Sequence, residues 1–157
     1  MSDHANELSA VLAHDALELD ERGAAYLDAA SSRVVVFDGA MGTNLQLAGL
    51  GPDDFGGPEL EGCNEVLVLS RPDVVAGIHS SFLSAGVDVV ETDAFGAFRT
   101  VLAEYDLADR VTEINLAAAR LAREAVDAVS GDGRRRWVAG NLGPGTRFPT
   151  LGQISYR

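Results

Sequence analysis

Three short apolar runs, each ending abruptly in polar residues, alternate with helix-like segments in this chain. The runs cover residues 34–37, 87–90 and 137–140. Such runs are typical of strands buried on both faces, and strands joined by crossover helices run parallel. The pattern therefore predicts an α/β fold in the order β-loop-α-β-α-β, with right-handed connections.

Two helical segments separate the runs. The first is expected to begin at Pro72, with a start signal from Ser70 and Asp73, and to end at Gly86. The second spans about residues 107–129, where apolar residues recur at spacings of three and four opposite a mostly charged face. The buried stripe of the first helix is predicted to be Val74, Val75, Ile78, Phe82 and Leu83.

The remaining segments carry weaker signals. Residues 39–69 are punctuated by glycine and turn formers, which indicates an elaborated loop. Residues 1–32 hold seven acidic residues and one arginine, and form an acidic N-terminal extension before a domain at 33–157. We expect this extension to be helical and packed on the domain; a solvated arm is the alternative. Its apolar face is Leu8, Val11, Leu12 and Leu19, with Tyr26 and Leu27 beyond Gly23. The arginine triplet at 134–136 is expected to be solvated.

Charge and composition exclude several classes of function. The net charge is −12, which disfavours nucleic acid as a partner, and all twelve basic residues are arginine, which removes lysine-dependent chemistry. Cys63 is the single cysteine, so no disulfide forms within the chain. Since neither a secretory leader nor a long apolar span is seen, we expect a cytoplasmic protein that does not bind membranes.

Polar side chains follow all three predicted strands. Asp38 follows the first, Glu91 and Asp93 the second, and Asn141 the third. The carboxyl ends of parallel strands share one edge of a sheet, so these groups should meet around one pocket.

The segment Asp38 to Thr43 is the strongest local motif. Its glycines let a ligand approach the backbone, whose N–H groups can receive a carboxylate or phosphate. A tight turn is the alternative interpretation. The segment is neither G-x-G-x-x-G nor a Walker A sequence, which disfavours dinucleotide binding.

This motif resembles the D-G-x-M-G-T signature of the homocysteine S-methyltransferase family. Other stretches also resemble segments of this family and occur in the same order along the chain. The last two are most similar to cobalamin-dependent, multi-module methionine synthases. These stretches are residues 53–56, 62–65, 71–75, 85–88, 91–95, 143–146 and 149–152.

The resemblance implies the first three βα units of a (β/α)₈ TIM barrel. It further implies a zinc ion, held by three cysteines, that binds homocysteine as a thiolate, and methyl transfer from methylcobalamin to give methionine. Partners would be cobalamin-binding and methyltetrahydrofolate-binding modules. The zinc cysteines of the family lie on later strands, so no metal ligand is expected here, and Cys63 is expected to be a partly buried apolar residue.

The resemblance also places the candidate substrate site. Asp38, Gly39, Gly42 and Thr43 are the first candidates for holding homocysteine, with backbone N–H groups meeting its carboxylate and acidic side chains its ammonium. Glu91 and Asp93 come second, although the family usually has Asn at position 93. Capping of backbone groups is the alternative role for Asp38 and Glu91. Met41 and Phe95 are expected to pack, and the three histidines are not expected to bind metal.

Three hypotheses about function are compatible with the sequence. The first is a methyltransferase fragment, inactive alone, that could self-associate through open sheet edges. The second is a non-catalytic small-molecule or partner-binding α/β module. The third, a nucleotide-binding domain, predicts stabilisation by NAD or ATP, which we do not expect.

Overall fold

The computed structural model describes residues 20–146, 149–151 and 153, which fall into two compact units. The first unit is Met1–Val35, and its described part contains the helix α2 (Glu21–Ser32). The Asp20 side chain caps this helix by accepting a hydrogen bond of 2.8 Å from the Gly23 N–H. No residue of α2 is buried. The predicted apolar face from Leu8 to Leu19 lies outside the described residues.

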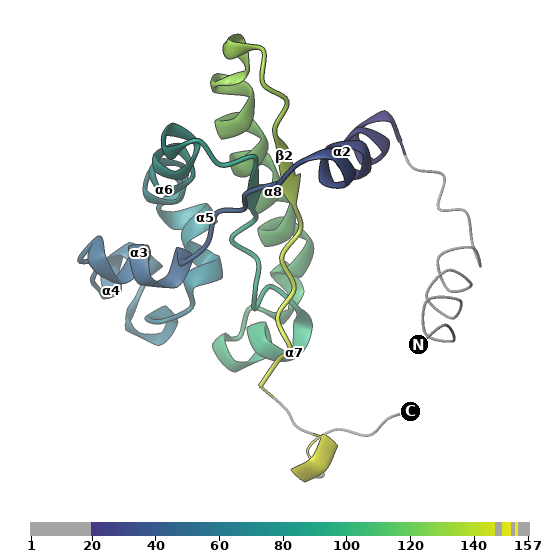
Figure 1. Ribbon diagram of the computed structural model, residues 1–157. Coiled ribbons are helices and arrows are strands. Elements are labelled where there is room, and N and C mark those ends of the chain that lie inside the picture. Colours follow the sequence, from purple (N-terminus) through teal and green to yellow (C-terminus); the bar gives the residue numbers. More distant parts are fainter. Residues whose placement is uncertain (1–19, 147–148, 152, 154–157) are drawn as a thin grey trace. The chain divides into compact units, whose positions relative to one another are not determined.

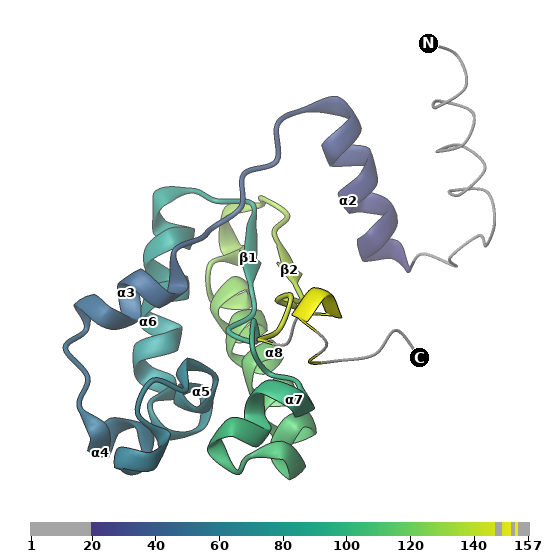
Figure 2. The ribbon, with the colours of Figure 1, turned by 90° about the horizontal axis from the view of Figure 1, so that it is seen from below.

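The second unit, Val36–Arg157, is built on a parallel sheet. Strand β1 (Val89–Glu91) pairs with β2 (Trp137–Ala139), and Val90 lies opposite Val138. Figure 2 shows the two strands side by side, with helix α8 (Val111–Ala128) next to them. The second and third predicted strands and their parallel direction are therefore confirmed.

The first apolar run pairs with the sheet but is not the buried strand that its sequence predicts. Phe37 forms a single parallel bridge with Val89, whose N–H donates to the Val36 carbonyl over 3.1 Å. Val36 is 49% exposed and Phe37 40% exposed. The prediction of burial on both faces is wrong because the run lies at the edge of the sheet, next to β1.

Both predicted crossover helices are present. Helix α6 (Pro72–Ala85) ends at Gly86, whose φ of 100° lies in the left-handed region that favours glycine. Helix α6 packs on α8, and both helices contact β1 (Figure 1). Side chains of α8 such as Ile114 and Ala118 are completely buried in a core that also contains Val75 and Ile78 of α6.

The segment after the first run is more ordered than the elaborated loop that its sequence predicts. Glycines limit the length of its helices without preventing them, because left-handed glycines such as Gly56 end them. Its elements are α3 (Met41–Leu47), α4 (Pro52–Phe55), η1 (Pro58–Leu60), η2 (Asn64–Val66) and α5 (Leu67–Ser70). Short helices also flank α8: α7 (Arg99–Leu102), η3 (Ala103–Tyr105), η4 (Ala108–Arg110) and η5 (Ser130–Asp132), with η6 (Pro149–Leu151) following β2.

The arginine triplet is not uniformly solvated. Arg136 is buried, and its guanidinium donates to the Asp132 carboxylate over 2.7 Å and 2.9 Å. Arg134, which is more exposed, lies 3.3 Å from the buried carboxylate of Asp88. The expectation of solvation is therefore wrong for Arg136, because a fork-like guanidinium can be buried when a carboxylate faces it.

No single helix in the described ranges is long and apolar enough to cross a membrane. Two consecutive helical segments, Asn64–Ser70 and Pro72–Ala85, are together long and apolar enough for a membrane span, but this rests on length and composition only, and they are bent by 107°.

Candidate functional site

A cavity of about 230 Å³ lies at the carboxyl ends of the parallel strands. Five of the six predicted site residues border it, whereas Thr43 is exposed on α3 and does not. The lining residues are Asp38, Gly39, Ala40, Met41, Gly42, Asn64, Glu65, Glu91, Thr92, Asp93, Phe95 and Asn141. Side chains that are distant in the sequence therefore meet at one edge of the sheet.

Asp38 connects the first apolar run to β1 at the cavity. Its Oδ1 accepts a hydrogen bond of 2.8 Å from the Glu91 N–H, so the carboxylate caps a backbone group. Its Oδ2 lies 3.9 Å from Nδ1 of the buried His79. Ala40, with φ of 53° in the left-handed region, then turns the chain into α3. The capping alternative for Asp38 is thus correct, and the same carboxyl group also borders the cavity.

Thr92 joins the ends of the two strands. Its N–H donates to the Ala139 carbonyl over 2.9 Å, and its Oγ1 accepts from the Asn141 N–H over 3.0 Å. These bonds fix the loop after β2 beside the loop after β1. Sequence reasoning overlooked Thr92, although it lies between the two chosen acidic residues Glu91 and Asp93.

Asp93 is a buried carboxyl group with an unsatisfied oxygen. Its Oδ2 has no hydrogen-bond partner within the described part of the chain. Burial first, and then the charge of Glu65, raise the pKa of Asp93 to about 7. Glu65, which also lines the cavity, accepts a hydrogen bond of 2.7 Å from the Gly96 N–H at Oε1. It was not among the predicted site residues, although it belongs to a stretch that carries the family resemblance.

Cys63 is not suited to bind a metal ion. It is completely buried, and its Sγ lies 3.9 Å from Glu65 Oε2. Burial, followed by the charge of Glu65, raises the pKa of the Cys63 thiol to about 11, so the thiolate that zinc requires is disfavoured. Among the described residues no three His, Cys, Asp or Glu side chains form a group that could hold a metal ion. The residues present here therefore do not fit the zinc ion that the family implies.

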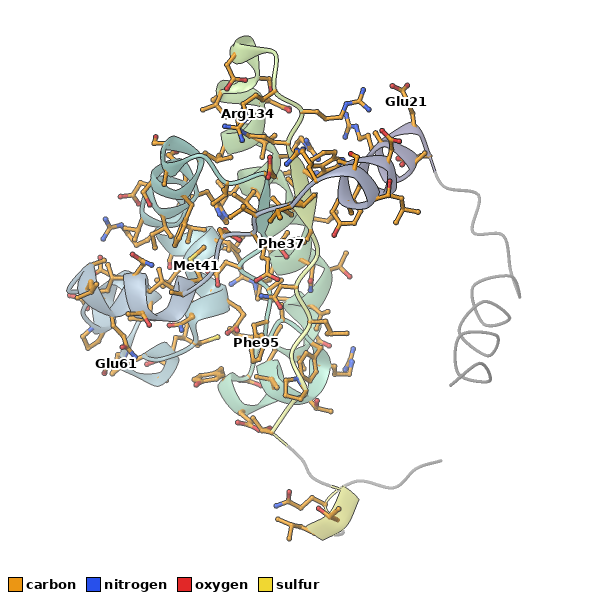
Figure 3. The ribbon with its side chains drawn as sticks, in the orientation of Figure 1. Glu21, Phe37, Met41, Glu61, Phe95 and Arg134 are labelled. Atoms are coloured by element: carbon orange, nitrogen blue, oxygen red, sulfur yellow. The ribbon has the colours of Figure 1, made fainter. Side chains whose placement is uncertain are left out.

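Met41 and Phe95, both labelled in Figure 3, provide apolar walls of the cavity. Met41 also packs against the core, as expected. Phe95 is 54% exposed and borders both this cavity and a neighbouring one of about 200 Å³, so it lines these cavities in addition to packing against Gly143. The Gly143 N–H donates to the Phe95 carbonyl over 2.8 Å, which fixes the loop after β2 against this residue.

The fold and the cavity together define an α/β protein with a cavity, lined by acidic side chains, at the carboxyl ends of parallel strands. The sequence model of the homocysteine S-methyltransferase family matches residues 35–156, and the chain belongs to this family.

The similar sequences include much longer proteins. The methionine synthase of Mycobacterium tuberculosis is 48% identical over 83% of this chain, and that of Mycobacterium leprae is 46% identical over 83%. The chain spans only 11% of the length of each.

Solved structures support the fold. The metallated form of the homocysteine methyltransferase MmuM from Escherichia coli matches with a TM-score of 0.60 and 23% identity, over 76% of this chain and 40% of that one. Its oxidised form matches with a TM-score of 0.62 and 22% identity, over 79% and 41%. These similarities indicate an α/β fold of the homocysteine methyltransferase type.

Proposed function

We propose that the cavity binds the amino-acid part of homocysteine, and that the chain is the first part of a homocysteine S-methyltransferase TIM barrel in a methionine synthase. The observation that carries this proposal is the set of four carboxyl groups around one small cavity, in a member of this family. The barrel domain is proposed to cover residues 33–157, after the acidic extension.

The charge around the cavity favours a ligand with an ammonium group. Asp38, Glu65, Glu91 and Asp93 border it, and no arginine or histidine is among its lining residues in the described ranges. A positive group placed there interacts favourably with several carboxylates in a partly dehydrated space. The ligand carboxylate would face the backbone at Gly39 and Gly42, where a Cβ built on Gly39 meets no atom within 4 Å.

The predicted set of substrate residues is narrowed by the geometry. Asp38, Gly39, Gly42, Glu91 and Asp93 remain proposed contacts because all five border the cavity, and Glu65 joins them. Thr43 is kept only as a neighbour of this set, since it lies outside the lining.

The proposed reaction requires groups that these residues do not provide. A zinc ion would activate the homocysteine thiol, and a cobalamin would carry the methyl group, both held by other parts of a longer protein. His79, the one histidine in the described part of the chain, is buried and lines neither cavity described here. We therefore assign substrate positioning to this chain and no step of methyl transfer.

The proposed partners follow from the same assignment. They are homocysteine, a cobalamin-binding module and a methyltetrahydrofolate-binding module, in the cytoplasm and without nucleic acid or membrane. The net charge of −12 and the buried thiol Cys63 support this setting. Self-association through open sheet edges is proposed for the isolated chain.

Calorimetric titration of the chain with L-homocysteine tests the proposal. We expect saturable binding that weakens at least tenfold in Asp38→Asn, which keeps an acceptor for the Glu91 N–H but removes a charge from the cavity. Glu59→Gln, a change on the short helix η1 and outside both described cavities, is the matched control and should bind like the wild type. Binding of NAD or ATP in place of homocysteine, or equal affinity in Asp38→Asn, would contradict the assignment.

A further inference from the structure

We propose that Asp93 holds a proton in the ligand-free cavity and releases it when an amino acid binds through its ammonium group. Binding would then be coupled to proton release near neutral pH. This inference rests on the proposed function, because it assumes that the cavity receives an amino acid.

The first support is the position of the Asp93 side chain. The residue is 6% exposed and lines the cavity, and its Oδ2 has no hydrogen-bond partner among the residues that the structure describes. An ionised carboxylate that is buried without a donor is costly, whereas the neutral acid carries no charge and has an O–H to donate. The site therefore favours the protonated form of Asp93.

The second support is the set of ionisable groups around Asp93. Glu65, from η2, acts on Asp93 electrostatically, and Cys63, from the preceding loop, is a neutral thiol. Asp38, which directly follows the first apolar run, and Glu91, the last residue of β1, border the same cavity. None of these groups is a cation, so protein charges at the cavity act against ionisation of Asp93. The raised pKa of Asp93, about 7, agrees with this arrangement.

Geometry also assigns the proton to Asp93 and not to Glu65. The Glu65 carboxylate already receives a hydrogen bond of 2.7 Å from the Gly96 N–H. The charged form of Glu65 therefore has a donor, which the charged form of Asp93 lacks.

An ammonium group supplies what the ligand-free cavity lacks. It brings one positive charge and three N–H donors, so its presence favours the ionised form of Asp93. The protonated carboxyl group and the ammonium ligand then become an ion pair, and one proton passes to the solvent. The ionised Asp93 carboxylate and the ammonium group together carry no net charge, as the protonated Asp93 did before binding, so little additional charge is buried at this pair.

Proton release can be measured by calorimetry of the wild-type chain at pH 7 in phosphate and in Tris, whose ionisation enthalpies differ. L-methionine is titrated beside L-homocysteine because it has the same ammonium but no ionisable thiol. We expect release of a fraction of a proton with both ligands. The affinity for each ligand should rise by up to about tenfold from pH 6 to pH 8. This rise corresponds to a bound ligand that lowers the pKa of Asp93 by about 2.

Asp93→Asn is the matched variant, since it keeps the size of the side chain and removes its ionisation. We expect it to bind both ligands with no proton release and with similar affinity at pH 6 and pH 8. Equal apparent enthalpies in the two buffers for the wild type would overturn the inference while leaving homocysteine binding intact. Proton release that persists in Asp93→Asn would also overturn the inference and leave homocysteine binding intact. A wild-type chain that binds neither ligand would overturn both the inference and the proposed function.

Discussion

His79 Nδ1 on α6 lies 3.9 Å from Asp38 Oδ2 at the cavity, with both side chains buried. This separation is longer than a hydrogen bond, and neither ring nitrogen of His79 has a hydrogen-bond partner in the described ranges. A polar ring without partners in a core costs about 1–3 kcal/mol, so stability alone does not explain its presence. Because its ring lies next to the Asp38 carboxylate, we expect it to limit the positions that this carboxylate can take.

Replacing His79 with leucine, which has a similar volume, distinguishes a role in stability from a role in placing the Asp38 carboxylate. We expect the thermal midpoint to stay level or rise, because two unsatisfied nitrogens are removed. Affinity for L-homocysteine should fall about fivefold, because the carboxylate of Asp38 loses its neighbour. Thermal unfolding and calorimetry on one preparation measure both quantities. Unchanged affinity would limit His79 to a packing role, whereas rescue of affinity in His79→Gln would support positioning.

Asp38 itself has a structural and a binding role that two substitutions distinguish. Asp38→Ala removes the acceptor of the Glu91 N–H and should lower the free energy of unfolding by about 1–3 kcal/mol. Asp38→Asn retains an acceptor oxygen, so it should stay close to the wild type in stability. Urea denaturation measures the difference. Equal loss in both variants would show that charge, and not the hydrogen bond, stabilises this junction.

The fold was predictable where a sequence signal is local. Helix α6 begins at Pro72 and ends before Gly86 as predicted, because both residues act on the backbone next to them. The prediction that the first apolar run is buried was wrong, because burial depends on neighbours that the sequence of the run does not specify. Val36 and Phe37 have the composition of an interior strand but lie at an edge of the sheet.

The candidate site was predictable where position along a strand decides it. Asp38, Glu91 and Asp93 each follow an apolar run, and all three line the cavity. Glu65 and Thr92 were not chosen, because their roles arise from tertiary hydrogen bonds to Gly96 and Asn141. Such bonds join segments about 30 to 50 residues apart and leave no periodic pattern in the sequence.

Gly143 is predicted to control the shape of the cavity through Phe95. A Cβ at position 143 would lie 2.6–2.7 Å from three ring carbons of Phe95, so Gly143→Ala must displace that ring. We expect weaker binding of L-homocysteine, by about tenfold, with a modest loss of stability of about 1–3 kcal/mol. Gly140→Ala is the control, because a Cβ there meets nothing within 4 Å. Equal behaviour of the two variants would show that the Phe95 ring has no part in the cavity.

The raised pKa of Asp93 makes a separate prediction about stability, which does not depend on any ligand. The folded pKa of about 7 lies above the ordinary value of 3.8, so the folded chain keeps a proton that the unfolded chain releases between these values. The contribution of Asp93 is therefore fully present below about pH 3.8 and is lost as the pH rises through 7. Between pH 5 and pH 8 the wild type should lose roughly 3 kcal/mol through this residue.

Asp93→Asn cannot lose this proton, so its stability relative to the wild type should increase over the same interval. Urea denaturation of both proteins at pH 5, 6, 7 and 8 gives the difference directly, since the other ionisable groups are common to both and largely cancel. Asp127→Asn, a change at an exposed carboxylate near the end of α8, serves as the control and should show no comparable trend. A difference that stays constant with pH would mean that Asp93 is already ionised at pH 5, and its buried oxygen would then require a donor from elsewhere in the protein.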